Sequence, residues 1–287
     1  MSVLNVAPRT VVESCFEASG TAELSFVYDV GLAVGVAEQA VRLAIRRLAD
    51  AGLLVQEGRG RRGRVRLLPA GVERLAADTR AIAFAYAQDR GTVAWDRIWR
   101  LHTFSVPEQE RATRDVLRRA LVTLGASPLT PGVYVTAHDL SLDLPREAPV
   151  AALQQLYTMT ATEILGPGCE TPRAVAEKLW PAAETIAAYE PLARFLDETR
   201  LPAPDAGRAE QMAYALRLAE GLGQGLNADP LLPKELREEP WPPAVVRARF
   251  LTAWNALERA APDLPLLHAW SSSGDLRDRE PRAELRS

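Results

Sequence analysis

Eight arginines crowd the segment between Arg42 and Arg66, where only Asp50 and Glu57 carry the opposite charge. Eight arginines against two acids give this segment a net charge of +6, although the whole chain has a net charge of −3. Guanidinium groups at this density are typical of surfaces that bind the phosphate backbone of nucleic acids. A solvated face would account for part of the cluster but not easily for all of it, so the segment predicts a DNA-binding surface.

Five of the nine candidate DNA contacts lie on an expected helix over Val36–Ala51. The apolar residues of this helix form one stripe, which consists of Val41, Ala44, Ile45 and Leu48. The other side carries the candidate contacts Gln39, Arg42, Leu43 and Arg46, and a fifth candidate, Arg47, lies on the flank of the helix. Arg46 and Gln39 are the candidates for base edges, because Arg suits guanine and Gln suits adenine. Arg47 could instead hold a salt bridge, and Leu43 could contact a thymine methyl group or pack on a neighbouring element.

The remaining candidates lie in the Arg/Gly turn of an expected hairpin with strands Leu53–Glu57 and Arg64–Leu68. We expect these residues to contact phosphates or to reach into the minor groove. They are Arg59, Arg61, Arg62 and Arg64. The same turn contains Gly58, Gly60 and Gly63, which spell the G-x-G-x-x-G dinucleotide fingerprint. That motif requires a following helix, whereas a strand is expected here, so the tip of a wing is the favoured interpretation.

Two shorter helices, Arg9–Ser19 and Ala22–Leu32, are expected before the arginine-rich segment. Three helices followed by a basic hairpin is the order of a winged helix-turn-helix, in which the third helix enters the major groove. A long helix over Pro69–Asp89 follows. It could connect the DNA module to the rest of the chain or pair two subunits.

The middle of the chain predicts a small α/β domain of the ferredoxin-like type. A strand is expected over Trp95–Phe104, which is rich in aromatic and β-prone residues, and a capping box that begins at Ser105 predicts a helix. The further elements expected are a strand over Val133–Ala137, a loop over Asp139–Pro149, a helix over Val150–Thr160 and a short strand over Thr162–Leu165.

From Thr171 to Ala261 helical patterns recur, and Gly221, Gly223 and Gly225 predict a loop among them. The last residues, from Ser271 onward, are charged and poor in apolar groups, which is typical of disorder. The expected fold class is therefore α+β. The expected domains are 1–90 (winged helix-turn-helix with connecting helix), 91–170 (ferredoxin-like), 171–270 (helical) and a disordered tail over 271–287.

Several other classes of protein are not expected from this sequence. His102, His138 and His268 are scattered and the two cysteines lie far apart, so neither a metal site nor a disulfide framework is expected. No apolar run approaches the roughly 18–20 residues of a membrane helix, and no secretion signal is recognised. We expect a cytoplasmic protein without a cofactor, because unpaired cysteines favour a reducing compartment.

Several stretches, in the correct order, resemble the PaaX-like family of transcriptional repressors of phenylacetate degradation. They are Gly35–Arg42, Gly60–Arg62, Leu68–Gly71, Ile98–Arg118, Asp229–Pro233 and Pro240–Pro242. The resemblance implies a homodimeric repressor that binds double-stranded DNA and leaves its operator when it binds an acyl-CoA, such as phenylacetyl-CoA. Ala37 departs from the family pattern, because a Ser or Thr would cap the recognition helix at this position.

The resemblance also suggests a small-molecule effector, for which the candidate residues are Trp99, Arg111, Arg114 and Arg118. The arginines could bind effector phosphates through charge-assisted hydrogen bonds, but a solvated face is the commoner role of such residues, as packing is for tryptophan. A ferredoxin-like domain also resembles small CRISPR-associated nucleases, so a metal-dependent nuclease is the alternative function. Asp96 is the only acid near the first strand, and metal-assisted cleavage needs more carboxylates, so no catalytic residue is assigned.

Overall fold

The computed structural model describes residues 4–266, except for the side chains of residues 76–80 and 108. His268 and the tail predicted over 271–287 lie outside the described residues. The described chain contains two small sheets and a helical C-terminal part, which confirms the α+β class. Within this range, none of the helices combines the length and the apolar character that crossing a bilayer requires.

Two compact units make up the fold. The first contains the chain up to Tyr86, then Tyr189–Gly225 and the chain from Pro243 onward. The second contains Ala87–Ala188 and Leu226–Pro242. The domain limits expected from the sequence remain predictions.

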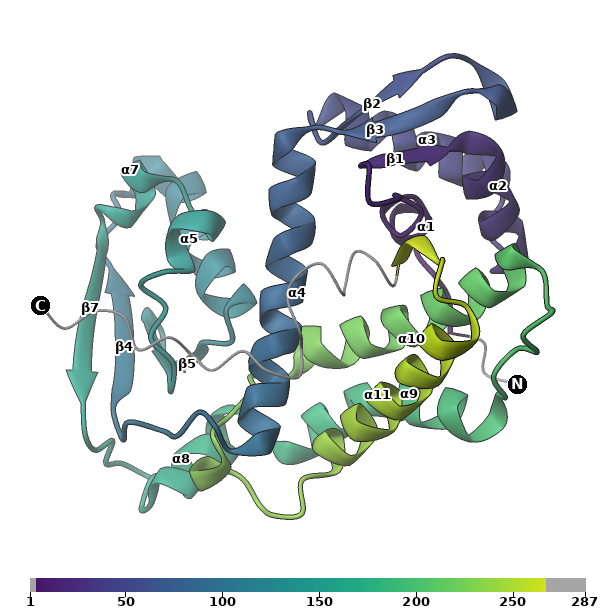
Figure 1. Cartoon of the computed structure of the whole chain (residues 1–287). Coiled ribbons are helices and arrows are strands. Elements are labelled where there is room, and N and C mark those ends of the chain that lie inside the picture. Colours follow the sequence, from purple (N-terminus) through teal and green to yellow (C-terminus); the bar gives the residue numbers. More distant parts are fainter. Residues whose placement is uncertain (1–3, 267–287) are drawn as a thin grey trace, which may run out of the picture. The chain divides into compact units, whose positions relative to one another are not determined.

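The N-terminal part of the first unit places three helices beside a three-stranded sheet (Figure 1). The helices are α1 (Pro8–Glu13), α2 (Leu24–Ala33) and α3 (Glu38–Asp50), and the strands are β1 (Thr21–Glu23), β2 (Leu54–Glu57) and β3 (Arg64–Leu67). The strands are antiparallel in the order β1-β3-β2. Val65 at the centre of the sheet is fully buried, which anchors β3 on the helices.

The third helix and the hairpin are confirmed, but the limits predicted for the first two helices are wrong. The first helix ends at Glu13 rather than Ser19, and the second begins at Leu24. Thr21–Glu23 instead form β1, which pairs with Arg64–Arg66 of β3. The hydrogen bonds of this pairing require an extended backbone, so these three residues cannot continue a helix.

The apolar stripe predicted on α3 is confirmed, because Val41, Ala44, Ile45 and Leu48 are all buried. Helix α2 comes close to this stripe at Gly31, where a Cβ atom would lie 3.0 Å from Cγ2 of Val41. The burial of one side of α3 leaves its opposite side at the protein surface.

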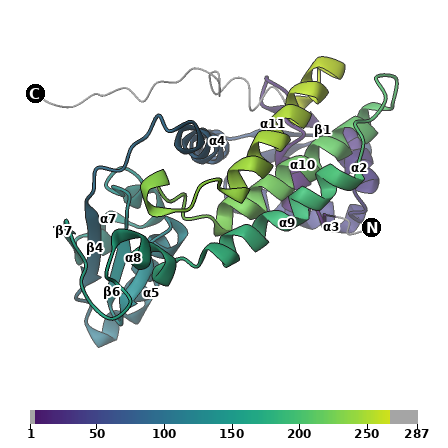
Figure 2. The same cartoon turned by 90° about the horizontal axis from the view of Figure 1, so that it is seen from below.

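Four long helices contribute to the first unit, namely α4 (Pro69–Arg90), α9 (Ala182–Glu198), α10 (Arg208–Ala228) and α11 (Pro242–Ala260). Helices α9, α10 and α11 lie side by side in both views (Figures 1 and 2). Buried Arg247 on α11 donates from Nη1 to the Tyr189 hydroxyl on α9 at 2.6 Å. The Tyr86 hydroxyl on α4 donates to the backbone oxygen of Arg247 at 2.9 Å. These two bonds join α4, α9 and α11 in the interior.

The loop predicted at Gly221, Gly223 and Gly225 is wrong, because all three residues lie within α10. A Cβ atom on Gly225 would lie 2.6 Å from Cε1 of Tyr189, and one on Gly221 would lie 3.1 Å from Cδ1 of Leu192. The close approach of α9 and α10, rather than a turn, therefore explains these two glycines.

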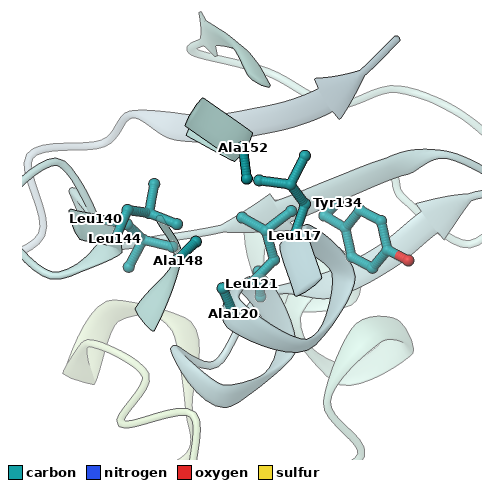
Figure 3. Packing of buried hydrophobic residues seen from close by; sticks show 9 residues of the cluster. Leu117, Ala120, Leu121, Tyr134, Leu140, Leu144, Ala148 and Ala152 are labelled. Carbon is teal, nitrogen blue, oxygen red and sulfur yellow. The ribbon is translucent and has the colours of Figure 1, made fainter. Parts of the chain in front are cut away.

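The second unit is built on a four-stranded antiparallel sheet of order β5-β6-β4-β7. Its strands are β4 (Trp99–Phe104), β5 (Ser127–Thr130), β6 (Val133–Thr136) and β7 (Leu156–Ala161). Helices α5 (Arg111–Thr123), α6 (Leu144–Glu147) and α7 (Val150–Leu153) pack on one face around Leu117, Leu121 and Tyr134 (Figure 3). Helix α8 (Pro172–Leu179) packs on the other face, around Trp99 and Val135.

The last strand of this sheet was predicted wrongly. The helix predicted over Val150–Thr160 ends at Leu153, and the strand is Leu156–Ala161 rather than Thr162–Leu165. β7 pairs with β4 along its whole length, and these long-range hydrogen bonds outweigh the helical preference of the preceding alanines.

Smaller differences concern the limits of other elements. The strand predicted from Trp95 begins at Trp99, β5 was not predicted, and α6 lies in the predicted loop. The helix expected from Ser105 begins with a 3-10 turn at Glu108 and continues as α5 from Arg111. The start of α8 is as expected, because the Thr171 hydroxyl accepts the N–H of Ala174 at 3.1 Å.

Candidate nucleic-acid interface

The outer side of α3 presents the predicted contact residues as one exposed stripe. Its members are Gln39, Arg42, Leu43, Arg46 and Arg47, and all of them are exposed. Their spacing of three or four residues follows the helical period, so they share one side of the helix. Leu43 is 44% exposed, so it is available for an apolar contact.

The first turn of α3 connects the helix to the hairpin. Ala37 precedes the helix in an extended conformation and provides no side-chain cap, as expected from its type.

Glu38 forms an ion pair with Arg42 one turn later, and its other oxygen lies 3.5 Å from Nη1 of Arg61 in the hairpin turn. The hydrogen bond to Glu38 raises the pKa of Arg42. Both guanidinium groups lie over the ring of Tyr28 on α2, at 5.6 Å for Arg42 and 5.7 Å for Arg61.

Arg61 is also bound to α2. Its Nη2 forms an ion pair with Asp29 and donates to the backbone oxygen of Ser25 at 3.3 Å. The tip of the hairpin is therefore attached to α2 and α3 by a single side chain.

Glu57 neutralises two further arginines, which lie on the neighbouring strand β3. Its carboxylate accepts from Nε of Arg64 at 2.8 Å and from Nε of Arg66 at 3.1 Å. Hydrogen bonds from Arg64 and then Arg66 lower the pKa of Glu57, so the acid stays ionised beside them.

The other four arginines of the segment are exposed and have no hydrogen-bond or ion-pair partner among residues 4–266. They are Arg46 and Arg47 on α3 and Arg59 and Arg62 in the hairpin turn. The structure thus brings the predicted site residues together on two adjacent elements and divides them into paired and unpaired groups. Four unpaired guanidinium groups are the ones ready to bind phosphate or base edges.

Three residues of this site were not predicted from the sequence, because they precede the arginine-rich segment: Tyr28, Asp29 and Glu38. The spacing of four between Glu38 and Arg42 is a signal that could have revealed one of these pairs. The pairs that involve Tyr28 and Asp29 depend on the folded chain and have no such signal.

The structure does not bring the candidate effector residues together. Trp99 is fully buried on the sheet face that carries α8, where its ring stacks on Trp180 with centroids 6.4 Å apart. Arg111 and Arg118 are exposed on α5, which covers the opposite face, and Arg114 donates to the backbone oxygen of Val106 at 3.1 Å. Their role in effector binding remains a prediction.

Asp96, on which the nuclease alternative depends, is engaged by its own neighbours. Its carboxylate forms an ion pair with Arg100 and accepts the N–H of Ile98 at 3.0 Å. The hydrogen bond from Arg100 lowers the pKa of Asp96. Within the part of the chain that the structure describes, no three His, Cys or acidic side chains are grouped as a metal site would require.

Comparison with known proteins identifies the sheet of the second unit. Residues 92–174 match the family model described as the PaaX protein central Cas2-like domain. This segment is a PaaX Cas2-like domain. It extends from before β4 to the first turn of α8 and contains the whole four-stranded sheet. The resemblance to the PaaX-like family is thereby confirmed.

The fold also has a relative of known structure beyond the Cas2-like domain. The chain is similar to "Uncharacterized protein Rv0674 from Mycobacterium tuberculosis", with a TM-score of 0.54 and 24% identity. The similarity covers 88% of this chain and 94% of that one, so the two share a fold over most of their length. None of the curated proteins matches the chain.

Proposed function

We propose that this chain is an effector-responsive regulator of transcription, a homodimeric repressor that binds double-stranded DNA through α3 and the β2–β3 hairpin. The observation that carries the proposal is the set of four arginines on these two adjacent elements that have no ionic partner among residues 4–266. The Cas2-like domain supports it, because proteins of the PaaX family are generally regulators rather than enzymes.

The order of three helices, a short strand and a basic hairpin supports this proposal, because it is the order expected of a winged helix-turn-helix. In this proposal α3 enters the major groove, where Arg46 reads guanine and Gln39 reads adenine. Arg47, Arg59 and Arg62 bind phosphates, which adds affinity for any sequence and makes binding depend on salt.

A dimer would hold two α3 helices roughly 34 Å apart, which is the distance between successive major grooves on one side of DNA. The effector, an acyl-CoA or a related ligand of aromatic catabolism, must bind the free repressor more tightly than the DNA-bound form. Only this difference in affinity can release the operator.

Fluorescence anisotropy of the full chain tests the proposal. A labelled duplex from upstream of its own coding region is compared with a scrambled duplex of the same composition across a salt series. We expect tighter binding to the native duplex and a linear fall of log K with log salt. Absence of binding to either duplex at low salt would overturn the proposal.

A matched pair of variants locates the surface. R46Q/R47Q removes two unpaired arginines from α3, and R111Q/R118Q removes two exposed arginines from α5. Both variants change the net charge equally. We expect a large loss of DNA affinity only for the first, and an equal loss for both would exclude α3 as the contact.

A further inference from the structure

Helix α2 ends in the turn that leads to α3, and this turn leaves one carbonyl group of α2 without a backbone donor. The last four carbonyl groups of an α-helix have no partner within the helix itself. Here the backbone N–H groups of residues 34–36 donate to the oxygens of residues 30–32. The oxygen of Ala33, the last residue of α2, receives no backbone N–H among the described residues. It therefore needs a donor from elsewhere.

Arg217 on α10 supplies this donor. Its Nη2 donates to the Ala33 oxygen at 3.2 Å, across 184 positions of the chain. A cation is favourable at this place because the carboxyl end of a helix has a partial negative charge. Helix α2 has no basic residue in its own last turn. Arg217 therefore caps α2 from a different helix.

The environment of Arg217 indicates that the cap is its specific role. Among residues 4–266, the Ala33 oxygen is its one hydrogen-bond partner and no carboxylate forms an ion pair with it. Its Nε is buried and has no partner in that range. Burial lowers the pKa of Arg217, which reflects a desolvation cost that no described carboxylate offsets. A solvated or ion-paired surface arginine would not have this cost.

Helix α10 also binds other parts of the N-terminal region. The Thr10 hydroxyl on α1 donates to the carboxylate of Glu220 at 2.9 Å, and Arg208 donates from Nη2 to Glu17 at 2.7 Å. Within the described part of the chain, α10 forms neither a hydrogen bond nor an ion pair with α3 or with the β2–β3 hairpin. Helix α10 thus holds α1 and α2 and leaves the proposed DNA contacts free.

We propose that Arg217 is a positioning residue for the DNA contact, which acts by fixing the turn between α2 and α3. This inference rests on the proposed function, in which Gln39 in the first turn of α3 reads a base edge. Hydrogen bonds to base edges tolerate only narrow limits of distance and angle, whereas long arginine side chains can follow a phosphate through small displacements. Loss of Arg217 should therefore reduce sequence preference more than general affinity for DNA.

Hydrogen exchange of the full chain, measured by mass spectrometry, tests the cap without DNA. R217M has no donor and should accelerate exchange about fivefold in the peptide that contains residues 34–36, as expected for the loss of one partly exposed hydrogen bond to a charged group. A peptide from β2 should be unaffected. R217K keeps the charge and a donor and should restore the exchange of the unmodified chain.

A matched variant controls for the change in charge. Arg259 on α11 is exposed and has no described partner, so R259M should leave exchange in the turn unchanged. Acceleration by R217M that is equal in the turn and in β2, or no greater than that of R259M, would overturn the inference.

Fluorescence anisotropy measures the consequence for DNA binding. R217M should reduce the preference for the native over the scrambled duplex about tenfold, the value for one lost base contact. The salt slope should stay unchanged, because the arginines proposed to bind phosphates remain. A purely structural role would lower the amount of folded protein and weaken binding to both duplexes equally, and that result would also overturn the inference.

The two measurements distinguish this inference from the proposed function. If the unmodified chain prefers the native duplex and R217M has the same preference, the inference fails and the proposed function stands. If the unmodified chain binds neither duplex, the proposed function fails and the positioning role fails with it. Faster exchange in R217M would then support Arg217 only as the cap of α2.

Discussion

Arg61 in the turn of the hairpin is ion-paired with Asp29 on α2. The same guanidinium lies 3.5 Å from an oxygen of Glu38 at the start of α3, so one side chain joins three elements. Arg62, the next residue, is exposed and has no partner among the described residues. Two adjacent arginines therefore differ in role, since Arg61 fixes the hairpin against the helices and Arg62 is available to a phosphate.

This difference predicts that R62A and R61A have distinct effects on DNA binding. R62A should weaken binding to native and scrambled duplexes alike and reduce the salt slope by about 0.9, the value for one lost phosphate contact. R61A should leave the salt slope nearly unchanged and accelerate amide hydrogen exchange in the hairpin turn. Equal changes in slope for the two variants would show that Arg61 is also a phosphate contact.

Glu38 forms ion pairs with Arg42 and Arg61, so under the proposed function it competes with DNA phosphates for the Arg42 guanidinium. E38Q should therefore strengthen binding to any duplex and steepen the salt slope by up to about 0.9, because the Arg42 guanidinium loses its ionic partner and gains a phosphate contact, whereas Arg61 stays paired with Asp29. Asp50, at the other end of α3, is exposed and has no described basic partner, so D50N is the control with the same change in charge. If D50N has the same effect as E38Q, net charge rather than the Glu38 pairs is responsible.

The uncapped start of α3 predicts a gain in stability. Ala37 has the backbone conformation of a capping residue but offers no side-chain acceptor. A37S should therefore raise the free energy of unfolding by about 1 kcal/mol, measured by urea denaturation. A51S at the opposite end of the same helix controls for the change in composition and should have little effect. An unchanged stability of A37S would mean that water already satisfies these N–H groups as well as a hydroxyl does.

Two glycines that lie two residues apart on α10 predict opposite effects of the same substitution. Nothing lies within 4 Å of a Cβ placed on Gly223, so G223A should stabilise the protein by up to about 1 kcal/mol through helix propensity. A Cβ on Gly225 would lie 2.6 Å from the Tyr189 ring, so G225A should destabilise it by about 1–3 kcal/mol. Thermal denaturation of the two variants provides the comparison, and a stabilised G225A would show that Tyr189 can move aside.

Histidines of the second unit predict a loss of stability in mild acid. Burial lowers the pKa of His138 and of His102 below the ordinary value of 6.5. The unfolded chain then binds protons more readily, so this stability is complete above pH 6.5 and falls as the pH drops from 6.5 towards the folded pKa values. His138 Nε2 lies 3.1 Å from the Pro230 oxygen and 3.0 Å from the Leu231 oxygen, so its protonation state affects the loop after α10.

Urea denaturation at a pH of about 7.5 and of about 5.5 measures this effect, because carboxylates stay ionised in that range. H138Q keeps a donor at this position and cannot become charged. It should reduce the difference between the two pH values, and an unreduced difference would assign the effect to other groups.

Local sequence signals explain why α3 and the hairpin were predictable. The buried stripe of α3 follows the helical period, and Gly52, with φ +69°, ends the helix in the left-handed conformation. β7 was missed because it is a strand by virtue of its pairing with β4, more than fifty residues earlier. The role of Gly225 is likewise set by Tyr189, on another helix.

The candidate site was predictable in its location and not in its division into paired and unpaired arginines. Counting charges between Arg42 and Arg66 gives the same weight to Arg61 and Arg62. In the structure the two arginines differ, because Asp29 on α2 forms an ion pair with Arg61 and not with Arg62. Whether an arginine is paired depends on which residues the folded chain brings close to it. The composition of the segment does not contain this information.

The first unit is assembled from three separate stretches of chain, and its border at Tyr86 falls inside α4. A chain cut there would lose the bond between the Tyr86 hydroxyl and the backbone oxygen of Arg247, a residue on α11. The N-terminal part of the first unit, which ends at Tyr86, is therefore joined to α11 and is not an independent piece that could be exchanged between proteins by a cut at this border. Under the proposed function, a change in the DNA sequence that is bound is therefore expected from substitutions on α3 and the hairpin rather than from exchange of the whole N-terminal part.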